Sequence, residues 1–413
     1  MTTPSRIATI GYAVEAAHAE ADRDIDVLIQ HRGEVVDVTG LAQEMLDPGG
    51  VYQRLGERGK AIPGVRGGTF TTRHHLYGHG ITAAGDLTAT PIATLLQYVF
   101  GALDVANDGG ICAAGWTAVT GDVTSVDTLA DGSLVRIGAP GDGRGGGQFF
   151  RATHSGGTVT LQTAAPAAPA ENDVIYAAQL LYPPTVTTPY DVTTLRWLLA
   201  TSSAQFWALG CAATAITITG LHSGAIPTVE ITWTVSDWDD ADETFPVTSP
   251  SIADYNAVPA GPGGSLFYQA AGTATRATLA AREIALRYEM DVVPLRGVGG
   301  NTGTESIYGF RRADVRCMVD VTVDAVDATT SPVHGDYFAT DPDAITLKHA
   351  LLTCSNGDGN AIGFYWPQLQ PTGRRPTQDV LNGLTVERLP FMAVPNSAGA
   401  SELERALMVL AMG

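Results

Sequence analysis

Two stretches of this chain alternate strictly between apolar and polar residues, and this pattern limits the folds that the chain can adopt. Residues 216–219 read Ile-Thr-Ile-Thr, and residues 229–235 read Val-Glu-Ile-Thr-Trp-Thr-Val. Because successive side chains of a β-strand point to opposite faces, each stretch predicts a strand with one buried face and one polar face. The segment GLHSGAIP between them predicts a β-hairpin. The polar strand faces are conspicuous, which favours a protein that assembles over an enzyme.

Other segments extend this pattern and predict a mainly β fold, of sandwich or barrel type, with a few packing helices (α+β). Strands are expected at 68–77, 134–137, 149–152, 159–161, 174–176, 283–293, 315–323, 362–369 and 384–391. A helix is expected after Thr90, the predicted N-cap, with Pro91 in its first turn. Further helices are expected at 193–200, at 343–353 and after Ser401, which has Glu404 at capping-box distance.

The length of 413 residues predicts more than one domain, because single cores rarely grow beyond about 250–300 residues. The expected division is an irregular N-terminal segment (1–64), a first module (65–111 and 181–240), an inserted small β domain (112–180), a linker (241–264) and a second module with a C-terminal helix (265–413). Both modules show a strand, a helix-sized apolar segment and then a strand pair. This shared order suggests duplication, although no residue-level repeat can be aligned.

The charge balance argues against a nucleic-acid-binding protein. Asp and Glu number 43 against 24 Lys and Arg, which gives a formal charge of −19. Proteins that bind the phosphate backbone need the opposite balance. An acidic surface could instead repel DNA or simply maintain solubility. Charged residues make up only 16% of the chain, which suits a surface largely covered by neighbouring molecules.

Cysteine usage and the N-terminal sequence bear on the compartment. Cys112, Cys211, Cys317 and Cys354 lie far apart with no C-x-x-C pair, so they are expected as buried thiols in a reducing cytoplasm. The first residues lack the basic and apolar regions of a signal peptide. There is no run of about eighteen apolar residues, so no membrane span is expected.

One histidine cluster has residue types that could bind a metal. His74, His75 and His79 lie in RHHLYGHG, but the glycines oppose a helix, and neither an H-E-x-x-H pattern nor a nearby carboxylate completes a zinc set. Histidines at a strand end and subunit contact are the favoured interpretation. No metal site is therefore expected.

Two other polar segments are interpreted as loops. The glycine-rich GDGRGGG at 141–147 lacks the G-K-[ST] ending of a phosphate loop and is interpreted as a hairpin tip. The acidic run around Trp238 departs from calcium-loop spacing and is interpreted as a solvated loop. There is no G-x-S-x-G elbow, so neither catalytic residues nor cofactors are expected.

Several longer passages resemble siphophage tail tube proteins, the major tail proteins. FWALGC followed by ITITGLHSGAIPTVEITWTVSDW is similar to their passage of strand, glycine–cysteine, long β-hairpin and tryptophan. GGTFTTRHHLYG with TPIATLLQYVFGAL resembles their early strand and packing helix. The segment from DGSLVRIG to VIYAA resembles a small β module that many of them carry, and LTVERLPFMAVPNSAGASELERALMVLAMG resembles their final strand and tail. The resemblance covers most of residues 65–413.

The resemblance implies a virion protein of the tail, assembled in the host cytoplasm, whose strands complete a β-barrel between subunits. Such rings stack into the conduit for DNA ejection, and the lumen passes DNA without binding it specifically. A trimer of tandem modules is favoured over a hexamer, and the other implied partners are tail proteins such as the tape measure and the tail terminator. The expected lumen or assembly residues are Thr217, Thr219, Glu230, Thr232, Thr234, Glu283, Arg287, Glu289, Asp320 and Thr322.

Two other classes of protein remain open at this point. A β-rich virion decoration protein or receptor- or carbohydrate-binding protein would expose aromatic residues on loops, for which Trp116, Tyr182, Tyr190 and Trp366 are the candidates. An enzyme that used the three histidines would need a metal.

Overall fold

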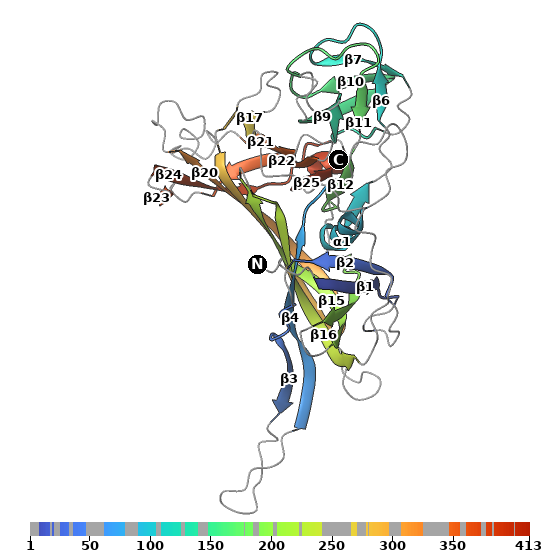
Figure 1. Ribbon diagram of the computed structural model, residues 1–413, viewed down its shortest axis with the longest axis vertical. Coiled ribbons are helices and arrows are strands. Elements are labelled where there is room, and N and C mark those ends of the chain that lie inside the picture. Colours follow the sequence, from blue (N-terminus) through green and yellow to red (C-terminus); the bar gives the residue numbers. More distant parts are fainter. Residues whose placement is uncertain are drawn as a thin grey trace, which may run out of the picture.

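The computed structural model shows a protein built almost entirely of antiparallel β-strands (Figure 1). It describes residues 8–16, 19, 25–32, 36–46, 62–78, 90–104, 109–124, 129–138, 148–176, 178–184, 190–200, 205–222, 225–241, 266–270, 278–279, 281–296, 307–324, 347–355, 361–372, 377–381, 384–399 and 401–413. The predicted mainly β fold is confirmed. No helix in these ranges combines the length and apolar character that a membrane crossing requires.

Nineteen strands belong to one hydrogen-bonded sheet system. They are β1 (Ala8–Val14), β2 (Val27–His31), β3 (Leu41–Leu46), β4 (Ile62–His75), β5 (Ala102–Asp104), β12 (Gln179–Tyr182), β13 (Tyr190–Asp191), β14 (Leu195–Ala200), β15 (Gln205–Leu221), β16 (Thr228–Ala241), β17 (Leu266–Ala270), β18 (Thr278–Leu279), β19 (Ala281–Arg296), β20 (Ile307–Asp324), β21 (Lys348–Ser355), β22 (Ala361–Pro371), β23 (Thr377–Leu381), β24 (Leu384–Ala393) and β25 (Val409–Met412). Eight of them lie side by side in the order β3–β4–β16–β15–β19–β20–β24–β23. We call this array the eight-strand row.

A second layer covers one face of the eight-strand row. β14 pairs with the first half of β15 and is followed by β1 and β2, while β22 pairs with the end of β24 and is followed by β21 and β25. Helix α1 (Pro91–Phe100) packs against β12, β5 and β2. The main core lies between the layers and contains Trp197, Trp233, Tyr288 and Trp366, all almost fully buried.

Helix α1 begins where the sequence predicts, and it ends at a glycine. The Thr90 side-chain oxygen accepts a hydrogen bond from the backbone N–H of Ala93 at 3.2 Å, so the predicted N-cap is confirmed. The helix ends at Gly101, whose φ of 114° lies in a region that side chains with a Cβ avoid. These local signals suffice because each involves residues only a few positions apart.

Six short strands close a separate small barrel at one end of the molecule (Figure 1). They are β6 (Gly110–Cys112), β7 (Thr120–Thr124), β8 (Ser133–Ile137), β9 (Phe149–Ser155), β10 (Thr158–Leu161) and β11 (Val174–Tyr176). The barrel occupies the stretch in which the sequence predicts an inserted β domain, and it has its own core around Val135, Phe150 and Val159.

The small barrel rests on the second layer through a close contact. The backbone N–H of Phe149 donates to the Thr353 side-chain oxygen at 3.1 Å. A Cβ on Gly363 would come within 2.6 Å of the Phe149 ring, so only glycine permits this approach. Arg151 of the barrel forms an ion pair with Glu404 of the short helix α3 (Glu402–Arg405). The barrel therefore packs on β21, β22 and α3.

This junction predicts a loss of stability in acid. His349 is only 4% exposed, and its Nδ1 lies 3.5 Å from Nε2 of Gln162. Burial, and secondly the charge of Arg151, lower the pKa of His349 to about 4. An unfolded histidine protonates near pH 6.5, so between pH 6.5 and 4 the unfolded chain takes up a proton that the folded chain does not. The free energy of unfolding should fall by up to about 3 kcal/mol as the pH drops through this window.

Urea unfolding of wild type and His349→Gln at several pH values tests this expectation. The decline should be weaker in His349→Gln, whose side chain does not titrate, and it should persist in the control His222→Gln. Equal pH slopes for wild type and His349→Gln would contradict the proposed origin of the decline.

Three of the predicted helices are wholly or partly wrong. Residues 195–200 form β14, and residues from 348 form β21, whereas 343–346 lie outside the described residues. Both segments are buried on both faces, so they lack the alternation of apolar and polar residues that marks a half-exposed strand. Ser401 does cap a helix through Glu404, but α3 ends at Arg405 and the chain then forms β25. Pairing of β25 with β12 and β22 overrides the local helical preference.

The N-terminal segment is also more regular than predicted. Residues 1–64, expected to be irregular, contain β1, β2, β3 and the start of β4. The acidic run, expected to be a loop, continues β16 as far as Ala241, while Asp242 and Glu243 lie outside the described residues. The expected linker at 241–264 is described only at its first residue. The two stretches assigned to separate modules meet in one sheet, where β15 pairs with β19.

Candidate functional site

The uncovered face of the eight-strand row is polar, and we call it the polar face. Along β16, half-buried Glu230, Thr232 and Thr234 alternate with the fully buried Ile231 and Trp233. Directly opposed residues of neighbouring strands share a face. One line across the polar face therefore runs Arg73, Glu230, Thr217, Arg287, Met318, Met392. This alternation arises because the opposite sides of β16, β15, β19 and β20 are buried in the core.

All ten residues that the sequence singled out lie on the polar face. Thr217 and Thr219 are on β15, and Glu230, Thr232 and Thr234 are on β16. Glu283, Arg287 and Glu289 are on β19, and Asp320 and Thr322 are on β20. The strand register places several of them directly opposite one another. Glu230 and Arg287 both lie opposite Thr217, and Thr322 lies opposite Glu283. Thr322 is the most buried of the ten, at 9% exposure.

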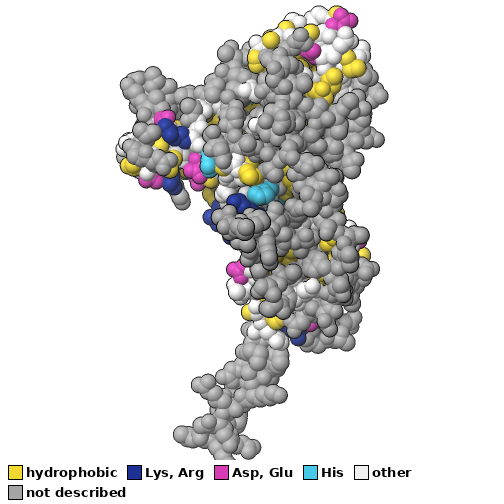
Figure 2. Space-filling model, in the orientation of Figure 1, with side chains coloured by type: hydrophobic (Ala, Val, Ile, Leu, Met, Phe, Trp, Pro, Cys, Tyr) yellow, Lys and Arg dark blue, Asp and Glu magenta, His cyan; other side chains and the backbone are white. Residues whose placement is uncertain are grey.

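Four arginines on the polar face, one each on β4, β19, β20 and β24, have carboxylate partners. Arg73 lies 2.5 Å from Glu230, and Arg287 lies 2.6 Å from Glu289. The other two pairs are Arg316 with Asp314 at 3.4 Å and Arg388 with Asp379 at 2.9 Å. The charged side chains of the described residues gather in Figure 2 beneath and on the lobe that carries β23 and β24.

Three carboxylates on this face form no ion pair with the described residues. They are Glu283, Asp291 and Asp320, and all three are exposed. Asp291 also lies directly opposite Asp314 across the β19–β20 pair, an arrangement of like charges that costs stability. The polar face therefore carries an excess of negative charge beyond its paired arginines.

The sequence reasoning missed several members of this charge pattern. Arg73, Asp291 and Arg316 lie within segments predicted as strands. Extending the alternation of apolar and polar residues along each segment would have placed them on the polar face. Asp314 and Asp379 lie in parts of β20 and β23 that were not predicted. No sequence signal links Arg73 with Glu230, because they are 157 residues apart.

The two outer strands of the row each have one neighbour among the described residues. β3 pairs only with β4, at Ile62–Gly68, and β23 pairs only with β24, at Leu384–Arg388. Neither strand contains Pro or Lys, the residues that commonly protect a sheet edge. β23 also exposes Val380 to 67%. Unprotected strand edges of this kind can pair with another chain.

The row also has a free strand edge in its interior, along the last part of β19, and this edge is protected, unlike the outer two. β15 pairs with β19 only as far as Glu289, so the remainder of β19, from Met290 to Arg296, pairs with β20 alone. This edge contains Pro294, which has no N–H and therefore blocks a continuous ladder. The contrast between β19 and the outer strands marks β3 and β23 as the edges suited to pairing.

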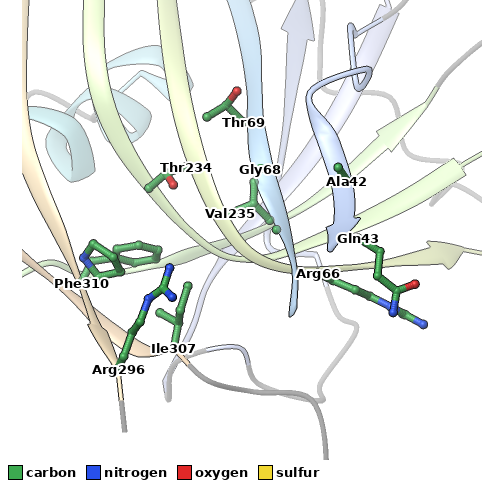
Figure 3. A pocket seen from close by; sticks show the side chains of 12 residues that line it. Ala42, Gln43, Arg66, Gly68, Thr69, Thr234, Val235, Arg296, Ile307 and Phe310 are labelled. Atoms are coloured by element: carbon green, nitrogen blue, oxygen red, sulfur yellow. The ribbon is translucent and has the colours of Figure 1, made fainter. Parts of the chain in front are cut away.

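The row forks where β19 leaves β15, and a hollow lies there (Figure 3). Its volume is about 470 Å³; Arg296, Ile307 and Phe310 line one side, and Gly68, Thr234 and Val235 line another. Arg66 at its rim donates to the Trp238 carbonyl at 3.2 Å and lies 3.6 Å from Asp239. The hollow offers no cluster of general acids, bases and nucleophiles.

The described residues hold no group of three or more potential metal-ligating side chains. His74 is buried, and its neighbour His75 points to the opposite face of β4, while His79 lies outside the described residues, as does the glycine-rich 141–147. The four cysteines are free and buried, and burial raises the pKa of Cys317 and Cys354 to about 12. These thiols are not poised as nucleophiles.

The aromatic candidates for ligand binding are not displayed on loops. Trp116 is 7% exposed, and its indole N–H donates to the Asp122 carbonyl at 2.7 Å. Trp366 is fully buried in the main core. Tyr182 and Tyr190 lie half-buried on β12 and β13. These four residues therefore do not provide the exposed loop aromatics that the alternative binding protein would need.

Comparison with known proteins adds no assignment. Neither the protein-family models nor the curated protein sequences contain a match to this chain. The fold and the polar face thus define a class, a mainly β protein with a wide polar sheet and open outer edges.

Proposed function

We propose that this chain is a structural subunit of a bacteriophage tail tube, in which copies join edge to edge into rings and the rings stack into a conduit for DNA. The observation that carries this proposal is the eight-strand row, with one polar face and two unprotected outer edges. Pairing β23 of one copy with β3 of the next would satisfy both edges and close a barrel.

The number of strands in the row bears on the number of copies of the chain in one ring. Three copies would contribute 24 strands, because each row has eight. With strands about 4.8 Å apart and tilted by about 40°, such a barrel would measure roughly 50 Å across. Six copies would double that diameter. In a ring of single modules, each module would pair with its neighbour through strand edges of separate subunits. Here the β15–β19 pairing makes such a joint between the two proposed tandem modules within one chain, which supports a trimer.

The stagger of the row also suits a closed barrel. β3 pairs with the beginning of β4, on one side of the line through Arg73, while β23 pairs with residues of β24 that lie on the other side of it. Strands of a barrel tilt against its axis, and neighbouring strands must therefore be offset progressively along their length. A row without stagger could close only into a barrel of untilted strands.

The proposed orientation puts the polar face toward the lumen and the second layer toward the outside. The carboxylates of Glu283, Asp291 and Asp320, which form no ion pair with the described residues, would repel DNA phosphates. The small barrel packs on the second layer and would decorate the outer surface. The proposed location is the virion tail, and the proposed partners are further copies, a tape measure protein and a tail terminator.

Negative-stain electron microscopy of the concentrated protein tests the proposal. The expected result is hollow rings or tubes, with three-fold symmetry in end-on views and a central opening. Compact single particles at every concentration would contradict it and shift the assignment to the alternative, a virion decoration or receptor-binding protein. Six copies around one ring would retain the tube and overturn the trimer.

A further inference from the structure

We infer that Glu230, Glu289 and Asp314 mask Arg73, Arg287 and Arg316, and that this masking keeps the polar face from binding the phosphate backbone of DNA. The inference deepens the proposed function, since it specifies how a face that contains arginines could let DNA pass. It concerns the chain itself, so it holds for an unassembled copy as well as for a ring.

The three arginines would otherwise be available to DNA. Their side chains are 57%, 61% and 69% exposed for Arg73, Arg287 and Arg316. A guanidinium group presents a planar set of donors that matches phosphate, and arginine is therefore a common phosphate ligand. Arg73 and Arg287 lie on the same line across the sheet, and Arg316 lies one line away, opposite Glu289. Without their partners they would form a cationic group on one surface.

The carboxylates of Glu230, Glu289 and Asp314 lie close enough to the arginines to neutralise this cationic group. The Arg73 Nε lies 2.5 Å from Glu230 Oε2, and the Arg287 Nη2 lies 2.6 Å from Glu289 Oε1. The Arg316 Nε lies 3.4 Å from Asp314 Oδ2. Glu289 stands between two arginines, since it contacts Arg287 on its own strand and lies opposite Arg316 on the next. Each of the three guanidinium groups thus has a carboxylate oxygen within 3.4 Å.

Stability does not account for these pairs. Exposed ion pairs contribute only about 0–1 kcal/mol. Arg287 with Glu289 and Arg316 with Asp314 are two residues apart on single strands, so neither pair ties strands together. Asp314 additionally faces Asp291, which costs stability. A role in setting the local charge explains why such carboxylates stand beside the arginines.

A matched pair of triple variants tests the inference. The unmasking variant is E230Q/E289Q/D314N. The control is E283Q/D291N/D320N, which also removes three negative charges, but from carboxylates that form no ion pair within the part of the chain that the structure describes. Binding of a fluorescently labelled DNA duplex is followed by anisotropy between 50 and 200 mM salt. The unmasking variant should bind with a log–log salt slope of about −2.7, which is roughly a 40-fold loss of affinity over this range. Wild type and control should not bind.

Several outcomes would overturn the inference. Equal binding by the two triple variants would show that net charge alone decides. No binding by the unmasking variant, with a wild-type circular dichroism spectrum, would show that the masked arginines are not the relevant groups. Adding R73Q, R287Q and R316Q to the unmasking variant should abolish its binding, and persistent binding would contradict the assignment. A chain that forms no rings but gains DNA binding on unmasking would overturn the tube proposal and leave the masking intact.

Discussion

A proline in β23 that removes an outward-facing N–H is expected to abolish ring formation while the chain stays folded. Successive N–H groups of a strand alternate in direction, so one of Gln378→Pro and Asp379→Pro removes a donor that faces away from β24. Each of three joints would lose a ladder hydrogen bond worth about 1 kcal/mol. The ring dissociation constant should then rise by at least about 100-fold, measured by sedimentation and electron microscopy.

The control for this experiment is Val380→Thr, which removes the exposed apolar side chain but keeps the backbone N–H. It should retain rings if backbone pairing at the β23 edge joins the copies. Ring formation in both proline variants would exclude β23 as the joining edge. Loss of rings in Val380→Thr alone would point to side-chain packing instead.

Replacing Arg312 by Met is expected to destabilise the fold by roughly 3–5 kcal/mol. Arg312 on β20 is 3% exposed and donates to the carbonyls of Val99 (2.8 Å) and Phe100 (3.1 Å) at the end of α1. It also donates to the Tyr190 hydroxyl at 2.8 Å. A positive charge at a helix C-terminus is favourable, and its removal would leave buried acceptors without donors.

The neighbouring residue provides the control for this prediction. Arg311→Met removes an exposed ion pair with Asp191 and should change stability by no more than about 1 kcal/mol. The measurement is denaturant unfolding, together with hydrogen exchange of the α1 amides, which should speed up in Arg312→Met. Similar unfolding midpoints for the two variants would show that Arg312 does not anchor the helix.

Local sequence signals predicted the parts of the fold in which one strand face is buried and the other is not. The alternation in 216–219 and 229–235 placed Thr217, Glu230 and Thr232 on one face, and the structure brings them together. The same reasoning failed for β14 and β21, because strands buried on both sides have no alternation to read. The candidate site was therefore more predictable than the second layer that supports it.

The sequence by itself determined the mainly β class, the polar and apolar sides of the long strands, and the start of α1 at Thr90. Each depends on residues within a few positions of one another, where side-chain periodicity and capping act directly. Only the tertiary structure decided that β15 and β19 are neighbours, that Glu230 meets Arg73, and that β3 and β23 end the row. Strand pairing joins residues far apart in the chain, and its register depends on the burial of whole sheet faces, which no local pattern encodes.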